Sequence, residues 1–334
     1  MQVSSIPEHM LAATCRVYGT SENIALETIP TPAIGNGKVL VRIIAVGLNA
    51  ADRYILWGKP YLVRLAYGIT RPRHKVPGQD LAGEVVMVGP GCTRLKVGDR
   101  VFGQGGSSLT EYAAVPEKKL QVIPDGVSFT DAAALGISGT TALQANDAAG
   151  VTDGTNILIH GASGGVGSTA TKIASARNAQ VTATCSAKNR ETVESFGAST
   201  VLDYATSPML DPASPYDSII DCVGNLPMRE ATAALVPGGK LIRVGFAKGQ
   251  WIGPIAHVVT APFAGIGTPG SVKVLTGRSS LESLAEIAQL ARDSMLTPHI
   301  ELNYELTDIH SAFRRLESGR TVGKSVVQVA PPQA

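Results

Sequence analysis

The stretch Ile157-Leu-Ile-His-Gly-Ala-Ser-Gly-Gly-Val-Gly-Ser-Thr-Ala-Thr-Lys172 joins a short apolar run to a cluster of glycines and then to a segment of helical character. Glycine loses more backbone entropy on folding than any other residue, so a cluster this dense needs a structural reason. We predict a strand that ends at His160, a tight turn, and a helix that begins at Gly165. The glycines are Gly161, Gly164, Gly165 and Gly167.

The sequence after this turn alternates between apolar runs and helical segments. We predict strands at residues 156–160, 180–184, 200–203, 217–223 and 240–245, the last after a turn at Pro237-Gly-Gly239, and helices at 165–177 and 188–196. Such alternation is typical of βαβ units and a parallel sheet. The glycine cluster then lies in the first βα turn of an α/β, Rossmann-type doubly wound domain.

This turn is a candidate phosphate site. A helix begins there with unpaired N–H groups and the positive end of its dipole, and side chains would block a pyrophosphate. The Gly161-x-x-Gly164-x-x-Gly167 spacing is looser than G-x-G-x-x-G, but its strand–turn–helix context favours dinucleotide binding. The alternative is a tight turn that binds nothing. The candidate cofactor-binding residues are Gly161, Ala162, Ser163, Gly164, Gly165, Val166 and Gly167.

The segment after the second strand bears on which dinucleotide binds. NAD-binding domains usually place an acidic residue there to hold the ribose 2′-hydroxyl. Here the strand runs into Cys185-Ser-Ala-Lys-Asn-Arg190, with no carboxylate before Glu191. Ser186 and Lys188 would attract a 2′-phosphate, and Arg190 is left open as a third contact. This favours NADPH; the alternative is a solvated helix start whose lysine binds nothing.

Residues 26–122 have the texture of strands and turns. Strands are predicted at 38–46 and 80–89, and a third strand is predicted after the Gly-Asp turn within 97–103; this half is expected to form a β-rich barrel or sandwich. Near the C-terminus, the apolar spacing predicts a helix at 280–292 capped by Ser280, then a helix at 308–317 and a strand at 325–329.

Composition indicates a globular protein without a nucleic-acid or membrane partner. The 334 residues carry a formal net charge of +2, with 44% hydrophobic and 17% charged residues, which is typical of a folded chain of about two domains. The N-terminus lacks the features of a secretory signal. Residues 249–272 contain no Asp, Glu, Lys or Arg, but prolines interrupt them, so we expect buried strand and loop near a pocket. A cytoplasmic location is therefore expected.

Neither the cysteines nor the histidines have the spacing of a metal site. Cys15, Cys92, Cys185 and Cys222 form no C-x-x-C pair and are expected to be reduced thiols. The six histidines are scattered along the chain. We therefore predict no bound metal.

These patterns, taken with other motifs, resemble the medium-chain dehydrogenase/reductase superfamily, and within it the zeta-crystallin-like quinone oxidoreductases and enoyl reductases. The resemblance spans nearly the whole chain. It implies a β-rich GroES-like catalytic domain at 1–132, an NADPH-binding Rossmann domain at 133–276, a C-terminal segment at 277–334 that returns to the catalytic domain, and a homodimer. Its motifs are Gly47–Asp52 (GLNAAD), Val76–Val85 (VPGQDLAGEV), Lys96–Gly103 (KVGDRVFG), Gly139–Ala142 (GTTA), the glycine turn and Gly323-Lys324.

One departure from the superfamily changes the expected reaction. Its zinc-dependent alcohol dehydrogenases carry a cysteine near the GLNAAD position and a His-Glu pair in the next motif, where this chain has Asn49 and Gln79-Asp80. Without thiolate or imidazole, a catalytic zinc ion lacks its usual ligands. The resemblance then implies zinc-free, NADPH-dependent reduction of a quinone or an α,β-unsaturated carbonyl. Two alternatives stay open: a zinc-free alcohol dehydrogenase or carbonyl reductase, and an NADPH-binding protein with a structural or partner-binding role.

The resemblance also assigns roles to single residues. Asn49 is expected beside the nicotinamide or the substrate carbonyl, or else in a local turn. Asp52 braces that loop at the substrate pocket or caps a helix, and Tyr54 donates a hydrogen bond or forms a wall of the pocket. The implied cofactor contacts, with Lys188 and Tyr204 at the 2′-phosphate, are Asn49, Thr141, Ser186, Lys188, Tyr204, Val223, Gly224, Gly245, Phe246 and Lys324. Further pocket candidates, which could equally belong to the core, are Trp57, Tyr61, Phe102 and Trp251.

Overall fold

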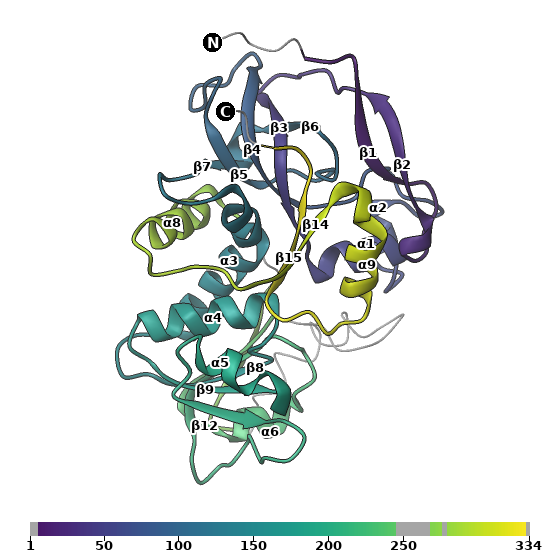
Figure 1. The fold of residues 1–334 in the computed structure, drawn as a ribbon. Coiled ribbons are helices and arrows are strands. Elements are labelled where there is room, and N and C mark those ends of the chain that lie inside the picture. The colour runs from purple at the N-terminus through teal and green to yellow at the C-terminus, as the bar shows by residue number, and fades with distance from the viewer. Residues whose placement is uncertain (1–5, 245–267, 276–278, 332–334) are drawn as a thin grey trace. The chain divides into compact units, whose positions relative to one another are not determined.

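The computed structural model describes residues 6–244, 268–275 and 279–331, and the chain divides into two compact units (Figure 1). Unit 1 consists of Met1–Ile137 and Ser279–Ala334, and unit 2 of Ser138–Arg278. The expected boundary at 132/133 lies inside helix α3 (Phe129–Ala149), and the one at 276/277 lies outside the described residues. Across the described ranges, no helix combines the length and apolar character needed to cross a bilayer.

Unit 2 is built on a six-stranded parallel sheet with the order β10-β9-β8-β11-β12-β13. Numbered along the unit, this is the order 3-2-1-4-5-6 of a doubly wound nucleotide-binding fold, so the predicted Rossmann sheet is confirmed. The winding reverses between β8 and β11, which is where such folds bind ligands. The strands are β8 (Asn156–His160), β9 (Gln180–Cys185), β10 (Thr200–Asp203), β11 (Tyr216–Asp221), β12 (Leu235–Arg243) and β13 (Ser271–Val274).

The helices of unit 2 follow the strands as the alternating pattern predicts. Figure 1 shows α4 (Gly165–Ala176) along the sheet, where it packs against β8 and β9. The next helix, α5 (Arg190–Glu194), is shorter than the predicted 188–196 because its first turn is the 3-10 helix η3 (Ala187–Asn189). The helix α6 (Met228–Ala233) precedes β12.

The turn predicted at Pro237-Gly-Gly239 is instead a bulge inside β12. The partner of β11 shifts from Leu235 opposite Tyr216 to Lys240 opposite Ser218, so β12 carries extra residues at this point. Gly238 has φ +82 there, a conformation that residues with a Cβ rarely adopt. The glycines therefore permit the bulge, and the strand begins before them.

Unit 1 is dominated by a seven-stranded sheet with the order β14-β15-β3-β4-β5-β7, and β6 pairs with β3. The central strand β3 is buried from Val39 to Gly47 because it pairs with β4, β6 and β15, which accounts for its apolar character on either side of Arg42. The β-rich character predicted for this half is confirmed. The strands are β3 (Lys38–Gly47), β4 (Asp80–Val88), β5 (Arg100–Gln104), β6 (Tyr112–Pro116), β7 (Leu120–Val122), β14 (Ile300–Glu305) and β15 (Lys324–Gln328).

Several smaller elements complete unit 1. A separate two-stranded sheet pairs β1 (His9–Cys15) with β2 (Ile24–Pro30). The helices α1 (Ala50–Trp57) and α2 (Val63–Tyr67) were not predicted, because 8 and 5 residues leave too little periodic pattern. The predicted C-terminal helices are α8 (Leu281–Arg292) and α9 (Ile309–Glu317), and the Ser283 N–H donates to Ser280 Oγ at 3.1 Å as the predicted cap.

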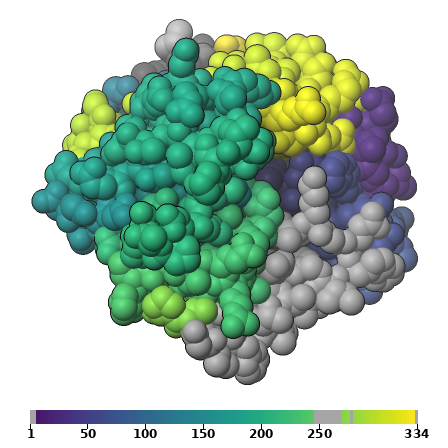
Figure 2. Space-filling view, turned by 90° about the horizontal axis from the view of Figure 1, so that it is seen from below, coloured from purple at the N-terminus to yellow at the C-terminus, as the bar shows by residue number. Residues whose placement is uncertain are grey.

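The two ends of the chain meet within unit 1. Figure 2 shows N-terminal residues, in purple, beside C-terminal residues, in yellow. The N–H and the hydroxyl of Ser21 donate to Glu317 at 3.0 and 2.9 Å, and Trp57 Nε1 donates to the same carboxylate at 2.8 Å. Phe313 of α9 lies in one core with Ile43 of β3. The last helix therefore helps to hold the first elements of the chain in place.

Candidate functional site

The glycine turn of unit 2 has the geometry of a phosphate cradle. Gly161 adopts φ +80 and its N–H donates to Thr184 Oγ1 at 3.2 Å. A Cβ on Gly167 would overlap the carbonyl oxygen of Gly161, so α4 packs directly on the turn. A Cβ on Gly164, the residue before α4, would meet nothing closer than 3.5 Å. The side of the turn at Gly164 is therefore open, and the first amides of α4, which have no acceptor within the helix, begin there.

A chain of hydrogen bonds holds the end of β8. His160 Nδ1 lies 2.7 Å from Thr184 Oγ1, and His160 Nε2 lies 2.8 Å from Asn225 Oδ1. Since the amide oxygen of Asn225 only accepts, we assign the ring proton to Nε2, and the Thr184 hydroxyl then donates to Nδ1 while it accepts from Gly161. His160 is 4% exposed. It is a core histidine that fixes the turn, and it has no spare nitrogen for a metal.

Asp221 fixes the loop after β11, on the other side of the switch point. Its Oδ1 accepts from the N–H groups of Val223 and Gly224 at 3.1 and 2.7 Å. Its Oδ2 forms a fully buried ion pair with Arg243 at 3.1 Å. A Cβ on Gly161 would lie 2.5 Å from Val223 Cγ2, so this loop touches the glycine turn. Val223 and Gly224, which were predicted as cofactor contacts, therefore lie at the cradle. The ion pair with Arg243 that holds Asp221 in place was not predicted from the sequence.

The predicted 2′-phosphate residues follow β9 and β10, which are neighbours in the sheet. Lys188 is exposed, Tyr204 is 52% exposed, and the Tyr204 N–H donates to Cys185 O at 3.2 Å. Arg190 is engaged elsewhere, since it donates to Val201 O at 2.7 Å and pairs with Glu194 at 3.6 Å. Ser186, Lys188 and Tyr204 thus gather at one edge of unit 2, and Arg190 does not join them by any contact of its guanidinium.

Unit 1 contains a buried cluster of charged and polar side chains at the start of α1. Lys324 Nζ donates to Asn49 Oδ1 at 2.6 Å and lies 3.7 Å from Asp80 Oδ2. Asn49 Nδ2 donates to Asp80 Oδ2 at 2.9 Å and to Gly47 O at 3.1 Å. Burial raises the pKa of Asp80, against the opposing attraction of Lys324, and burial lowers the pKa of Lys324, against the attraction of Asp80. This cluster fixes the orientation of the Asn49 amide.

Asp52 adds a second carboxylate to this cluster. It is 1% exposed, Oδ2 accepts from the Asn49 N–H at 2.8 Å, and Oδ1 has no hydrogen-bond partner among the described residues. Burial raises the pKa of Asp52 to about 7, assisted by the charge of Asp80. A proton on Asp52 leaves one carboxylate, Asp80, opposite one ammonium, Lys324. Asp52 thus helps to cap α1, which was one of its two expected roles. When Asp52 is protonated, the charges of Asp80 and Lys324 balance each other and the cluster is neutral.

Asp52→Asn is expected to stabilise the protein more as the pH rises. Between about pH 4 and about pH 7, folded Asp52 keeps a proton that the unfolded chain releases, so this residue lowers the stability progressively over that window. Asparagine keeps an oxygen for the Asn49 N–H and removes the titration, a difference of up to about 1.4 kcal/mol per pH unit. Urea unfolding at about pH 5 and about pH 8 measures it. The exposed Asp125→Asn is the control, and equal gains at both pH values would contradict the assignment.

The described aromatic candidates do not gather around one cavity. Tyr54 and Trp57 pack edge to face at 6.4 Å with Arg53 against both rings, and Arg53 also donates to the Tyr54 hydroxyl at 3.1 Å. Tyr61 stacks under Arg64. Phe102 is 2% exposed inside β5. Thr141 lies in α3 and is 8% exposed; Gly245, Phe246 and Trp251 lie outside the described residues.

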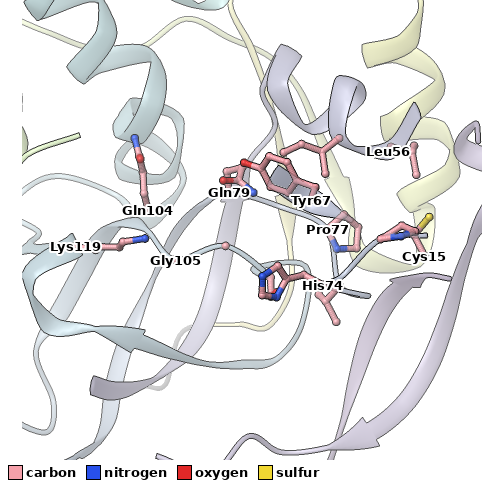
Figure 3. A pocket seen from close by; sticks show the side chains of 14 residues that line it. Cys15, Leu56, Tyr67, His74, Pro77, Gln79, Gln104, Gly105 and Lys119 are labelled. Atoms are coloured by element: carbon pink, nitrogen blue, oxygen red, sulfur yellow. The ribbon is translucent and has the colours of Figure 1, made fainter. Parts of the chain in front are cut away.

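A cavity of about 240 Å³ opens in unit 1 near the buried cluster (Figure 3). Figure 3 shows the ring of Tyr67 with its hydroxyl beside the Gln79 amide, and Lys119 beside Gln104. Burial raises the pKa of Tyr67, with the charge of Asp52 adding to the effect, so its hydroxyl keeps its proton. Trp57, Tyr61 and Phe102 do not line this cavity. The lining residues are Cys15, Ile55, Leu56, Tyr67, Pro72, His74, Val76, Pro77, Gln79, Gln104, Gly105, Gly106, Ser107 and Lys119.

Comparison with known proteins agrees with this architecture. Residues 35–125 match the family described as alcohol dehydrogenase GroES-like domain, and residues 196–327 the family described as zinc-binding dehydrogenase. A chloroplast envelope quinone oxidoreductase homolog of Arabidopsis thaliana is 33% identical over 317 residues, 90% of this chain and 92% of that protein. A 2-methylene-furan-3-one reductase of Solanum lycopersicum is 31% identical over 342 residues, 98% of this chain and 81% of that protein. The solved structure of the quinone oxidoreductase from Coxiella burnetii has a TM-score of 0.84 at 26% identity, over 96% of this chain and 100% of that one.

A doubly wound unit with an open phosphate cradle, in one chain with a β-rich unit, defines a nucleotide-dependent oxidoreductase. The chain belongs to the medium-chain dehydrogenase/reductase superfamily, in its zeta-crystallin-like branch of quinone oxidoreductases and enoyl reductases. Membership implies a nicotinamide cofactor. The open side of Gly164, the first amides of α4 and the loop fixed by Asp221 fit the pyrophosphate and adenosine of such a cofactor.

Zinc, which one family description names, does not fit the residues of unit 1. The positions that match the superfamily's zinc ligands hold the Asn49 amide, Gln79 and the Asp80 carboxylate. The Lys324 ammonium lies 2.6 Å from Asn49 Oδ1 and 3.7 Å from Asp80 Oδ2, on the oxygens that a metal would need. The positive charge of Lys324 there repels a divalent cation, and none of Asn49, Gln79 and Asp80 supplies a thiolate or an imidazole.

Proposed function

We propose that this protein is a zinc-independent, NADPH-dependent oxidoreductase that reduces a quinone or an α,β-unsaturated carbonyl. The observation that carries the proposal is the replacement of metal ligands by the Asn49–Asp80–Lys324 cluster in a chain that otherwise keeps the nucleotide cradle. Relatives named quinone oxidoreductase and 2-methylene-furan-3-one reductase support the same class of substrate. A site without a Lewis acid suits an acceptor with a conjugated carbonyl, because the carbonyl oxygen of the acceptor itself takes up the charge that hydride transfer produces.

The residues of unit 1 then bind and polarise the acceptor. When bound, the nicotinamide cofactor supplies a hydride. The Tyr67 hydroxyl and the Gln79 amide line the cavity, and both are hydrogen-bond donors for the carbonyl oxygen on which negative charge develops. Asn49 is held by three hydrogen bonds, so its amide presents a fixed dipole. The direct contact of Asn49 and Tyr54 with the reacting groups stays a prediction.

NADPH is proposed over NADH because of the residues that follow β9 and β10. Lys188 and Tyr204 are exposed at adjacent strand ends, and Ser186 directly follows β9. The nearest carboxylate on β10, Asp203, accepts from the Ala205 N–H at 3.0 Å and so caps its own loop. A lysine and two hydroxyls suit a phosphate better than a ribose hydroxyl.

Lys188→Ala is expected to weaken NADPH binding by about 10- to 100-fold and to leave NADH binding nearly unchanged. The lost interaction is a charged hydrogen bond to the 2′-phosphate, of about 1.5–3 kcal/mol. Fluorescence titration of both cofactors measures the change. Lys240→Ala removes another exposed lysine of unit 2 and is the matched control. An equal loss for both cofactors would refute the assignment of Lys188.

A substrate panel tests the reaction itself. Absorbance of NADPH is followed with quinones, enones and aldehydes in the presence of a metal chelator. Oxidation with quinones or enones supports the proposal, whereas oxidation with aldehydes alone would indicate a carbonyl reductase. Tight NADPH binding without turnover would indicate a structural or partner-binding role. A homodimer and a cytoplasmic location stay predictions.

A further inference from the structure

The positive charge of the chain is concentrated in one segment. Of its 29 Lys and Arg residues, six lie in residues 53–79, where none of the 27 Asp and Glu residues lies. The rest of the chain therefore has 23 basic and 27 acidic residues. A nearly neutral protein thus carries a locally cationic segment. The six are Arg53, Lys59, Arg64, Arg71, Arg73 and Lys75.

This segment forms most of the wall of the cavity in unit 1. Eight of the fourteen lining residues, from Ile55 to Gln79, belong to it. Lys119, outside it, is the one Lys or Arg among the fourteen lining residues, and the exposed Arg71, Arg73 and Lys75 alternate along the chain with the lining residues Pro72, His74 and Val76. None of the fourteen lining residues is acidic. A cavity with a lysine and no acid in its lining, next to exposed cations on the segment that forms its wall, attracts anions.

Carboxylates do not neutralise these cations. Arg53 donates to Leu316 O and to the Tyr54 hydroxyl, and Arg64 donates to Gly58 O and stacks on Tyr18. Over the described ranges, Arg71, Arg73, Lys75 and Lys119 form no ion pair. The nearby carboxylates are occupied otherwise: Glu27 pairs with Arg16 and feels Lys75 only at longer range, Glu317 accepts from Trp57, and Asp52 is buried in the cluster.

We infer that the acceptor reduced by this protein carries a negatively charged phosphate or carboxylate group outside its reducible bond, and that this group docks on a cationic wall, defined as Lys119 of the lining together with the exposed Arg71, Arg73 and Lys75 of the wall-forming segment. The inference rests on the proposed function and narrows its substrate class. The conjugated carbonyl reaches the Tyr67 hydroxyl and the Gln79 amide, while the anion stays at the cationic wall. Neutral acceptors fill the same cavity without this attraction.

Matched acceptors test the inference in the wild-type protein. Crotonyl-coenzyme A and the crotonyl thioester of N-acetylcysteamine share one reacting group and differ in phosphates; a quinone carboxylic acid and its methyl ester differ in a carboxylate. The charged member of a pair is expected to have a kcat/KM higher by about 10-fold or more at low ionic strength, and this advantage should shrink as salt is added. The pair that responds identifies the anion. Equal kcat/KM values in both pairs, independent of salt, would overturn the inference and leave the proposed function standing.

Variants locate the anion site. Arg71→Gln/Arg73→Gln/Lys75→Gln, and separately Lys119→Gln, are expected to reduce the charged-to-neutral ratio of kcat/KM by about 10-fold. Lys118→Gln removes the neighbouring exposed lysine, which does not line the cavity, and should leave the ratio unchanged. A ratio that falls equally in all variants would overturn the site. If no acceptor is reduced, the proposed function fails. Calorimetric titration of coenzyme A then tests the anion site by itself. Equal binding of coenzyme A by the wild type and the triple variant would overturn the anion site.

Discussion

Lys324→Met is expected to lower the free energy of unfolding by about 3–5 kcal/mol, because it removes one partner of a buried ion pair. Lys324 is 3% exposed and Asp80 is fully buried. Methionine has nearly the length of lysine, so packing changes little while Asp80 loses its counter-charge and Asn49 Oδ1 loses its donor. Chemical denaturation followed by circular dichroism measures the loss.

The double variant Lys324→Met/Asp80→Asn separates charge from packing. Asparagine at 80 removes the uncompensated carboxylate and keeps an oxygen for the Ile137 N–H, which now lies 2.9 and 3.0 Å from the two carboxylate oxygens. We expect it to be more stable than Lys324→Met alone. Lys119→Met, at an exposed lysine of the same unit, should stay within about 0.5 kcal/mol of wild type. A double variant no more stable than the single one would show that the buried charges are not coupled.

Gly167→Ala is expected to destabilise unit 2 by about 1–3 kcal/mol or more and to abolish cofactor binding. The new Cβ would overlap Gly161 O and lie 2.9 Å from Ala162 Cα, both backbone atoms that cannot turn aside. Either α4 or the turn must then move, and the cradle moves with it. Thermal unfolding and NADPH titration measure the two effects.

Gly164→Ala is the matched control, one helical turn away. Its Cβ would meet nothing closer than 3.5 Å, and its φ of −81 suits alanine, so stability should stay within about 0.5 kcal/mol of wild type. The methyl group would nevertheless project into the open side of the turn. NADPH affinity is therefore expected to fall by roughly 10- to 100-fold, or about 1.4–2.8 kcal/mol. An NADPH affinity equal to that of the wild type would show that the pyrophosphate does not bind at this turn.

Unit 2 was predictable because its pattern is local. Parallel strands buried on both faces appear as short apolar runs between turns, and the predicted strands 156–160 and 200–203 agree with β8 and β10 residue for residue. The bulge in β12 was not predictable, because it depends on pairing with β11. In unit 1, the helices α1 and α2 were not predicted, because they are too short to show a helical periodicity.

The candidate site divides in the same way. The turn Gly161–Gly167 could be predicted from the sequence, because its glycines lie close together along the chain and side chains in their place would block a pyrophosphate. The ion pair of Asp221 with Arg243 joins residues 22 positions apart, and the bond of Lys324 to Asn49 joins residues 275 apart. The periodicity of the sequence cannot predict these two pairs, because only the tertiary fold brings their residues together. The two expectations for Asn49, a local turn and a functional amide, are compatible, since its N–H serves the turn and its side chain the cluster.

Because β15 brings Lys324 to the centre of the β-rich unit, that unit cannot be finished while the ribosome is still making the chain. Unit 2, which is contiguous in sequence, is complete well before β15 is synthesised. Until then, the carboxyl groups of Asp52 and Asp80 lack the Lys324 ammonium that they face in the folded protein. A premature stop codon between positions 279 and 324 would leave a finished unit 2 attached to a unit 1 that lacks β15 and the Lys324 ammonium.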